Sequence, residues 1–173
     1  NTVTGSAAYR AAPHWYELRG LAAGAPYIRQ QGTYAPNSYH RWMGSIAMDR
    51  EGNVSLGYSL MDATAGIRAS IAYTGRAWND PLGTPPPGEV VMPSGGGVQT
   101  SNLNRWGDYS TMTLDPTDDC GFWYTNEYYS ANAEVDWKTR VGAFRFDSCA
   151  ALIFRDDYEE QNLGAWDAIE PPL

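Results

Sequence analysis

The sequence has little positive charge. Lysine and arginine total 12 against 20 aspartate and glutamate residues, which gives a formal net charge of −8. A protein that binds nucleic acid needs a basic face to release counterions from the phosphate backbone. Anionic membrane surfaces select basic segments for the same reason. We therefore expect no nucleic-acid partner and no electrostatic attachment to a membrane.

Long apolar runs are also missing. No segment approaches the roughly 20 apolar residues of a membrane-spanning helix, so we expect no membrane insertion. No window keeps apolar residues at helical spacing, which argues against long amphipathic helices. The first residues, Asn-Thr-Val-Thr, lack the basic and apolar regions of a signal peptide. We interpret the chain as a protein whose signal was removed or as a piece of a longer protein.

Residues that bind transition metals are scarce. The sequence has two cysteines and two histidines, and the histidines, His14 and His40, are distant from the cysteines. A structural zinc site needs four such ligands in tetrahedral geometry. Asp115, Asp118 and Asp119 offer oxygen ligands for calcium, but they are more simply interpreted as turn residues that bind local backbone amides. We expect no metal and no cofactor.

The two cysteines fit the two sides of one hairpin. If the strand from Cys120 pairs with a strand that ends near Phe146, the turn centres near Glu134, among turn-forming residues. Cys120 and Cys149 then lie opposite each other, within reach of a disulfide that would stabilise the fold by roughly 3 to 4 kcal/mol. We expect this disulfide, and with it an extracellular or periplasmic location. Two unrelated buried thiols are the alternative.

The sequence is rich in aromatic residues and in turn formers. Seven tryptophans and twelve tyrosines, with glycine and proline in every segment, suit short strands joined by tight turns. A chain of 173 residues is long enough for one domain with a sizeable core. Alternation and turn residues predict strands over residues 14–19, 26–32, 45–49, 54–60, 67–73 and 89–92.

The order of these strands starts again later in the chain. The Arg41-Trp42 start of one unit recurs as Arg105-Trp106, which indicates a repeat. Units of four antiparallel strands that return to a new first strand are blades of a β-propeller, with a β-sandwich as the alternative. Residues 1–149 then form about two and a half blades, fewer than the four or more that close a propeller. We expect exposed apolar faces at both ends, completed by further blades or other chains.

The repeated segments resemble secreted bacterial β-propellers of the sialidase-like, BNR-repeat group. The resemblance covers residues 14–147, although the Asp-box of the group is not intact because the turn after Asp49 lacks its closing tryptophan. Residues 150–173 look like a final strand and tail or the start of a further secreted module, such as a jelly-roll. The resemblance rests on the two Arg-Trp starts, the hairpin at residues 48–53, and residues 106–110, 114–116 and 122–128.

This resemblance suggests candidate catalytic residues. Arg41 and Arg105 start first strands, which converge on a propeller channel, where two guanidinium groups can grip the carboxylate of an acidic sugar. Glu127 and Tyr128 look like the nucleophile pair of sialidases, with Asp108 as the second acid. Each also has a structural interpretation: the arginines stack on rings or bind carbonyl groups, Glu127 is a loop carboxylate and Tyr128 packs.

Three exposed tryptophans are candidate ligand-binding residues. Trp42, Trp106 and Trp123 can stack on sugar faces, although packing between blades explains them equally well. The leading expectation is a non-catalytic segment of a secreted propeller that binds a glycan or protein through its channel face. A sialidase-like glycoside hydrolase, with part of its active site on missing blades, is the alternative.

Overall fold

The computed structural model describes residues 2–4, 9–84, 88–92, 94–102 and 105–149. The final strand, tail or further module that we expect in residues 150–173 lies outside this range. The described residues form eleven strands in four antiparallel sheets, and no helix. The strands are β1 (Thr2–Thr4), β2 (Arg10–Ala12), β3 (His14–Arg19), β4 (Tyr27–Thr33), β5 (His40–Met48), β6 (Val54–Asp62), β7 (Ile67–Arg76), β8 (Val90–Val91), β9 (Thr111–Leu114), β10 (Phe122–Tyr128) and β11 (Lys138–Phe144).

The described part of the chain contains no helix long and apolar enough to cross a membrane.

The middle sheet has four strands in the order β5-β6-β7-β8, each antiparallel to the next. The predicted all-β class is confirmed, and this one sheet has the four antiparallel strands expected of each unit, whereas the sheet that contains β9 has three. In β5, Met43 has a φ of +53°, and the register shifts between Trp42 and Ser45. This bulge bends β5 and separates its Arg-Trp end from the rest of the strand.

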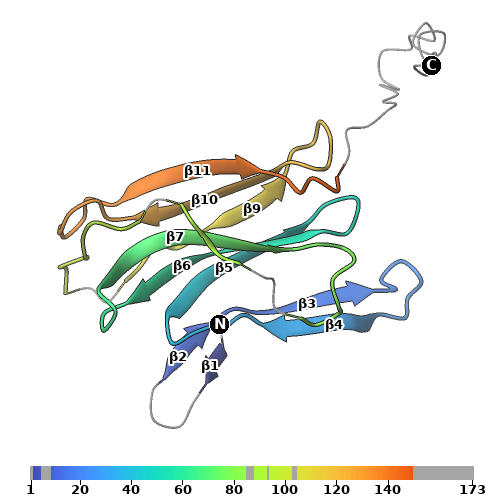
Figure 1. The fold of residues 1–173 in the computed structure, drawn as a ribbon, viewed down its shortest axis with the longest axis horizontal. Coiled ribbons are helices and arrows are strands. Elements are labelled where there is room, and N and C mark those ends of the chain that lie inside the picture. The colour runs from blue at the N-terminus through green and yellow to red at the C-terminus, as the bar shows by residue number, and fades with distance from the viewer. Residues whose placement is uncertain (1, 5–8, 85–87, 93, 103–104, 150–173) are drawn as a thin grey trace, which may run out of the picture.

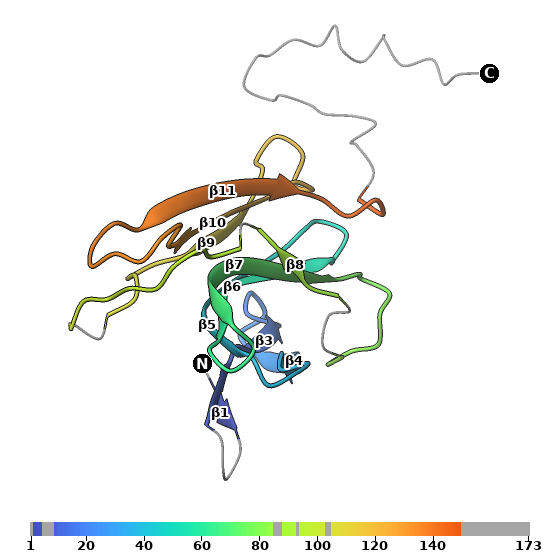
Figure 2. The ribbon, with the colours of Figure 1, turned by 60° about the vertical axis from the view of Figure 1, so that its left-hand side comes forward.

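Three sheets stack in layers. The pair β3-β4 covers one face of the middle sheet, and the three-stranded sheet β11-β10-β9 covers the other (Figures 1 and 2). β6 is therefore buried along almost its whole length, as expected for a strand with two covered faces.

Each of the two interfaces between layers has its own apolar core. Toward β3-β4, the buried residues are Trp15, Tyr34, Leu56, Tyr58, Leu60 and Ala72. Toward the three-stranded sheet, they are Ile71, Met112, Phe122 and Tyr124. The ring of Tyr124 lies directly on the backbone of Gly57, where a Cβ would clash with it. Gly57 therefore lets the two sheets approach closely.

The first hairpin, β1-β2, was not expected from the sequence. Its strands have three residues each, too short for alternation to be read, and they pair from Thr2 with Ala12 to Thr4 with Arg10. The hairpin leads directly into β3.

The expected disulfide between Cys120 and Cys149 is present, with the Cα atoms 5.6 Å apart. Its register differs from the expected one. β10 and β11 pair Phe122 with Phe144, so the ladder, continued, would set Cys120 against Phe146. Cys149 reaches Cys120 because a turn, closed by a 3.0 Å hydrogen bond from the Cys149 amide to the Phe146 carbonyl, folds the chain back.

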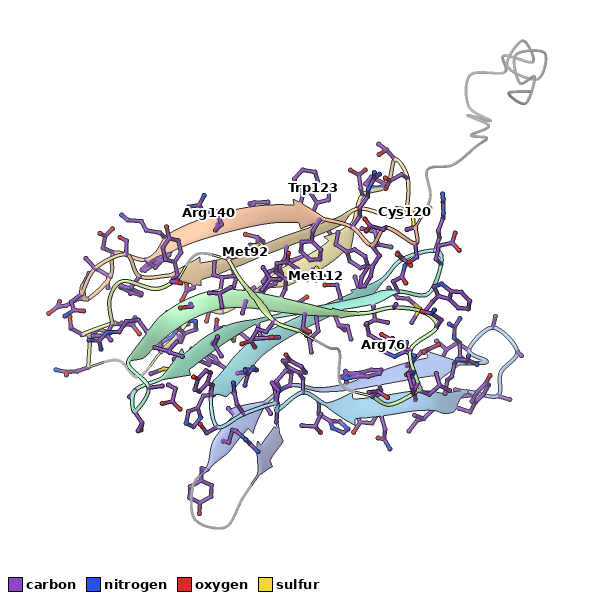
Figure 3. All side chains as sticks on the ribbon, in the orientation of Figure 1. Arg76, Met92, Met112, Cys120, Trp123 and Arg140 are labelled. Atoms are coloured by element: carbon purple, nitrogen blue, oxygen red, sulfur yellow. A yellow bond between two sulfur atoms is a disulfide. The ribbon has the colours of Figure 1, made fainter. Side chains whose placement is uncertain are left out.

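Both outermost sheets carry apolar side chains on their free faces. Tyr16, Leu18 and Ile28 are 54%, 51% and 52% exposed in the β3-β4 pair. In the three-stranded sheet, Trp123 and Val141 are exposed, and Figure 3 shows Trp123 pointing away from the middle sheet. The expected apolar faces at both ends of the stack are therefore found.

Candidate functional site

An open pocket of about 450 Å³ lies at one end of the three-stranded sheet. Glu127 comes from the end of β10, Arg105 and Asp108 from the loop before β9, and Trp137 from the residue before β11. Three of the five predicted catalytic residues therefore meet in one place. The full lining is Gln99, Arg105, Gly107, Asp108, Glu127, Val135 and Trp137.

The loop before β9 is shaped by Gly107. Its φ is +44°, and a Cβ there would lie 3.1 Å from Cδ of Glu127. A glycine at this position adopts the left-handed conformation without strain and lets the backbone rest against the carboxylate. The expectation that Arg105 starts a strand is wrong. β9 begins only at Thr111, so Arg105 and Trp106 lie in a loop, whereas Arg41 and Trp42 lie in β5.

The pocket holds two carboxylates and one guanidinium group. Burial raises the pKa of Glu127, and the charge of Asp108 raises it further, while the backbone N–H of Gly107 opposes both by donating a hydrogen bond. Nη2 of Arg105 lies 2.5 Å from Oδ1 of Asp108, and both side chains are more than half exposed. The site therefore combines a half-buried carboxyl group with a raised pKa and a solvent-exposed ion pair.

Arg41 lies in the core rather than in the pocket. Its side chain is fully buried, and Nε and Nη2 donate to the two carboxylate oxygens of Glu89 at 2.7 and 3.2 Å. The guanidinium also donates to the Tyr39 carbonyl and lies over the rings of Tyr34 and Tyr58. This arrangement matches the structural interpretation of the residue, in which it stacks on rings and binds a carbonyl group.

Glu127 and Tyr128 lie on different sides of β10. Glu127 lines the pocket, whereas Tyr128 packs against the core between the middle and three-stranded sheets. Adjacent residues of a strand point to opposite faces, so the expected nucleophile pair is not assembled within this strand.

The three predicted tryptophans separate into a pair and a single residue. Trp42 and Trp106 contact each other edge to face, with ring centroids 5.6 Å apart, and Nε1 of Trp106 donates to Oγ of Ser59 at 3.1 Å. Trp123 lies on the free face of the three-stranded sheet, where its Nε1 donates to Oδ2 of Asp115 at 3.1 Å. None of the three lines the pocket.

Sequence reasoning missed the aromatic residue that does line it. Trp137 is 51% exposed and follows Val135 and Asp136 in the connection between β10 and β11. A tryptophan beside a predicted turn, without a pairing partner in a strand, is the signal that could have identified it. Gln99 carried no such signal, because it reaches the pocket only through a parallel bridge with Ala133.

In the acidic turn between β9 and β10, the carboxylates of Asp115 and Asp118 accept hydrogen bonds from backbone amides of the same turn. Oδ1 of Asp115 accepts from the Thr117 amide at 2.9 Å, and Oδ1 of Asp118 accepts from the amides of Cys120 and Gly121 at 2.9 Å each. For Asp115, the hydrogen bonds from Thr117 lower the pKa; for Asp118, the bonds from Gly121 and Cys120 do so. These are the Asx-type turns expected from the sequence.

Comparison of the chain with protein-family models, with curated proteins and with solved structures finds no match.

Proposed function

We propose that this chain is a secreted module that binds a glycan in the pocket lined by Glu127, Arg105, Asp108 and Trp137. The observation that carries the proposal is the meeting of an exposed indole ring with several hydrogen-bonding side chains in one open pocket of about 450 Å³. Ligand pockets combine aromatic walls with a few placed polar groups that fix orientation. The disulfide supports an extracellular or periplasmic location, because disulfides persist in oxidising compartments.

Sugar rings have apolar C–H faces and polar edges. Trp137 offers a flat apolar surface for such a face, and tryptophan suits sites that are partly apolar and partly wet. Arg105, Asp108, Glu127 and Gln99 provide both donors and acceptors for hydroxyl groups. The alternative occupant of the pocket is a loop of a protein ligand that offers similar polar groups.

We further propose that the stacked sheets are consecutive blades of a β-propeller, completed by further blades or other chains. The first strands of successive sheets lie side by side: Oγ of Ser110 donates to the Met43 carbonyl at 2.7 Å, and the Met112 amide donates to Oγ of Ser45 at 2.8 Å. First strands surround the central channel of a propeller. The pocket, which borders the loop into β9, would then open toward the channel face.

A glycan array with the purified chain tests the proposed function. We expect selective binding, reduced roughly three- to tenfold by Trp137→Ala because aromatic contacts contribute on this scale. Trp78→Ala is the matched control, since Trp78 is 56% exposed and lies outside the pocket. Equal losses in the two variants, or no binding by the wild-type chain, would contradict the proposal.

A glycoside hydrolase is the second candidate function. Its support is the raised pKa of Glu127, caused first by burial, with a second carboxylate, Asp108, in the same pocket. General acids retain their proton in this way, and glycosidases pair two carboxyl groups. Turnover of fluorogenic glycosides, sialosides included, that is abolished by Glu127→Gln would favour the enzyme. Glycan binding without turnover would favour the binding module.

A further inference from the structure

The charge balance of the pocket bears on the kind of sugar that it accepts. Its three charged side chains are Arg105, Asp108 and Glu127. Arg105 is already paired with Asp108 at 2.5 Å, whereas Glu127 forms no ion pair within the described residues. The second arginine expected at an acidic-sugar site, Arg41, is buried against Glu89. The pocket therefore presents a net negative charge to a ligand.

An anionic ligand would meet two obstacles. The charge of the Arg105 guanidinium is already offset by Asp108, and a carboxylate bound to Arg105 would lie in the same pocket as Glu127. Like charges at short range repel, and the net charge of −8 on the whole chain adds an unfavourable field. Acidic sugars are thus disfavoured both locally and at long range.

A cationic ligand would meet favourable groups instead. Glu127 is half-buried and accepts a hydrogen bond from the Gly107 backbone, so its carboxylate is held in place. The ring of Trp137 lines the same pocket, and cations are attracted to indole faces. An ammonium group between a fixed carboxylate and an indole ring would gain both a charge-assisted hydrogen bond and a cation–π contact.

We propose that the pocket selects amino sugars, recognised through their protonated amine by Glu127 and Trp137, and discriminates against sugars that carry a carboxylate. This inference rests on the proposed glycan-binding function and specifies its ligand class.

Calorimetric titration of the full chain with three oligosaccharides of equal length tests this selectivity. Oligomers of glucosamine and N-acetylglucosamine differ only in the C2 substituent, an amine in the first and a neutral acetamide in the second, and an oligomer of galacturonate supplies the carboxylate. We expect affinity to fall in that order, with the amine oligomer favoured on the order of tenfold over the acetamide oligomer, as for a hydrogen bond to a charged group.

Two variants test whether the preference for the amine oligomer comes from the pocket. Glu127→Gln keeps the shape and removes the charge, so it should lower the affinity for the amine oligomer about tenfold more than the affinity for the acetamide oligomer and thereby abolish the preference between them. Glu134→Gln is the matched control, because Glu134 is exposed on the same hairpin connection and does not line the pocket. The control should keep the wild-type order of affinities.

Protonation of Glu127 provides an independent readout. The raised pKa, due first to burial and then to Asp108, means that amine binding should weaken as pH falls through a range above that of an ordinary glutamate. Arg105 and Asp108 are the charged groups that face Glu127 in the pocket. The Glu127→Gln variant should lack this pH dependence.

The outcomes separate the two proposals. If none of the three oligosaccharides binds, the glycan-binding function fails and the selectivity fails with it. If sugars bind but the carboxylate oligomer binds as tightly as the amine oligomer, only the selectivity is overturned. A preference for the amine that survives Glu127→Gln also overturns it, because the charge would then come from elsewhere.

Discussion

At the residue scale, two arginines with the same sequence context have opposite roles. Arg41 is enclosed by rings and by Glu89, while Arg105 is exposed and paired with Asp108. Both precede a tryptophan, so the local motif cannot distinguish them. The difference arises because Glu89 reaches Arg41 from a distant part of the chain, whereas Asp108 is only three residues from Arg105.

Replacing each arginine by methionine tests this contrast in stability. Arg41→Met leaves the Glu89 carboxylate, which also accepts a hydrogen bond from the Tyr58 hydroxyl, without its cation, and we expect a loss of about 3 to 5 kcal/mol, as for a broken buried ion pair. Arg105→Met is the matched control and should cost under about 1 kcal/mol, because the pair is exposed. Urea denaturation measures both, and similar losses would refute the contrast.

Gly57 limits the distance between two sheets. Gly57→Ala should destabilise the protein by about 1 to 3 kcal/mol, because the new methyl group meets the buried ring of Tyr124. In a Tyr124→Leu background the same change should cost clearly less, since residues in contact are coupled. Thermal denaturation of the two single variants and the double variant measures this coupling, and strict additivity would exclude the contact as the cause.

At the scale of elements, the hairpin formed by β10 and β11 is held together by a hydrogen-bonded ladder and by a disulfide. The ladder pairs Phe122 with Phe144, and the disulfide lies beyond it, where the turn at residues 146–149 returns the chain. The disulfide therefore ties the residues after β11 to the residues before β10, which the ladder does not pair.

Removing the bridge should be costly. Replacing both Cys120 and Cys149 by alanine is expected to lower stability by about 3 to 4 kcal/mol, the loop-closure estimate for a separation of 29 residues. Guanidinium denaturation of the variant and of the reduced wild-type chain should then give similar midpoints, both below that of the oxidised protein. An unchanged midpoint on reduction would show that the bridge contributes no stability.

At the scale of the whole molecule, each outer face of the stack carries apolar side chains that are exposed among the described residues. If further blades or other chains complete it, the isolated chain should self-associate as its concentration rises, through the face that carries Trp123. Light scattering after size exclusion measures this, and Trp123→Ser should weaken it while Trp78→Ser does not. A monomer at every concentration would contradict coverage by a second copy.

Acid should destabilise the layered fold partly through Glu17. Burial opposes its ionisation, but hydrogen bonds from Gln30 and Arg19 and the charge of Arg29 outweigh it and lower the pKa. The folded pKa is therefore below the unfolded value of about 4.3, so this stabilisation is complete above that pH and is lost as pH falls through the folded pKa.

The melting temperature as a function of pH measures this contribution. Glu17→Gln should be less stable at neutral pH and should show a shallower loss of stability on acidification than the wild-type chain. Glu51→Gln is the control, because the Glu51 carboxylate is 44% exposed and its pair with Arg50 is near the surface. Parallel curves for the Glu17 variant and the wild-type chain would exclude this linkage.

The sequence by itself determined most of the strands and the disulfide pairing. The alternation in β6 and β7, the turn residues between them and the spacing of Cys120 and Cys149 are local properties, and local properties are visible in one chain. The resemblance to sialidase-like propellers suggested five catalytic candidates, and three of them, Arg105, Asp108 and Glu127, do meet in the pocket.

Only the tertiary structure decided which candidates act together. Arg41 joins the core because Glu89, Tyr34 and Tyr58 approach it from other segments of the chain. Trp137 joins the pocket because the loop before β9 and the connection between β10 and β11 meet at the same end of the three-stranded sheet. Burial, charge compensation and pocket shape depend on which segments lie side by side in space. That information is spread over the whole chain and is not contained in any single motif.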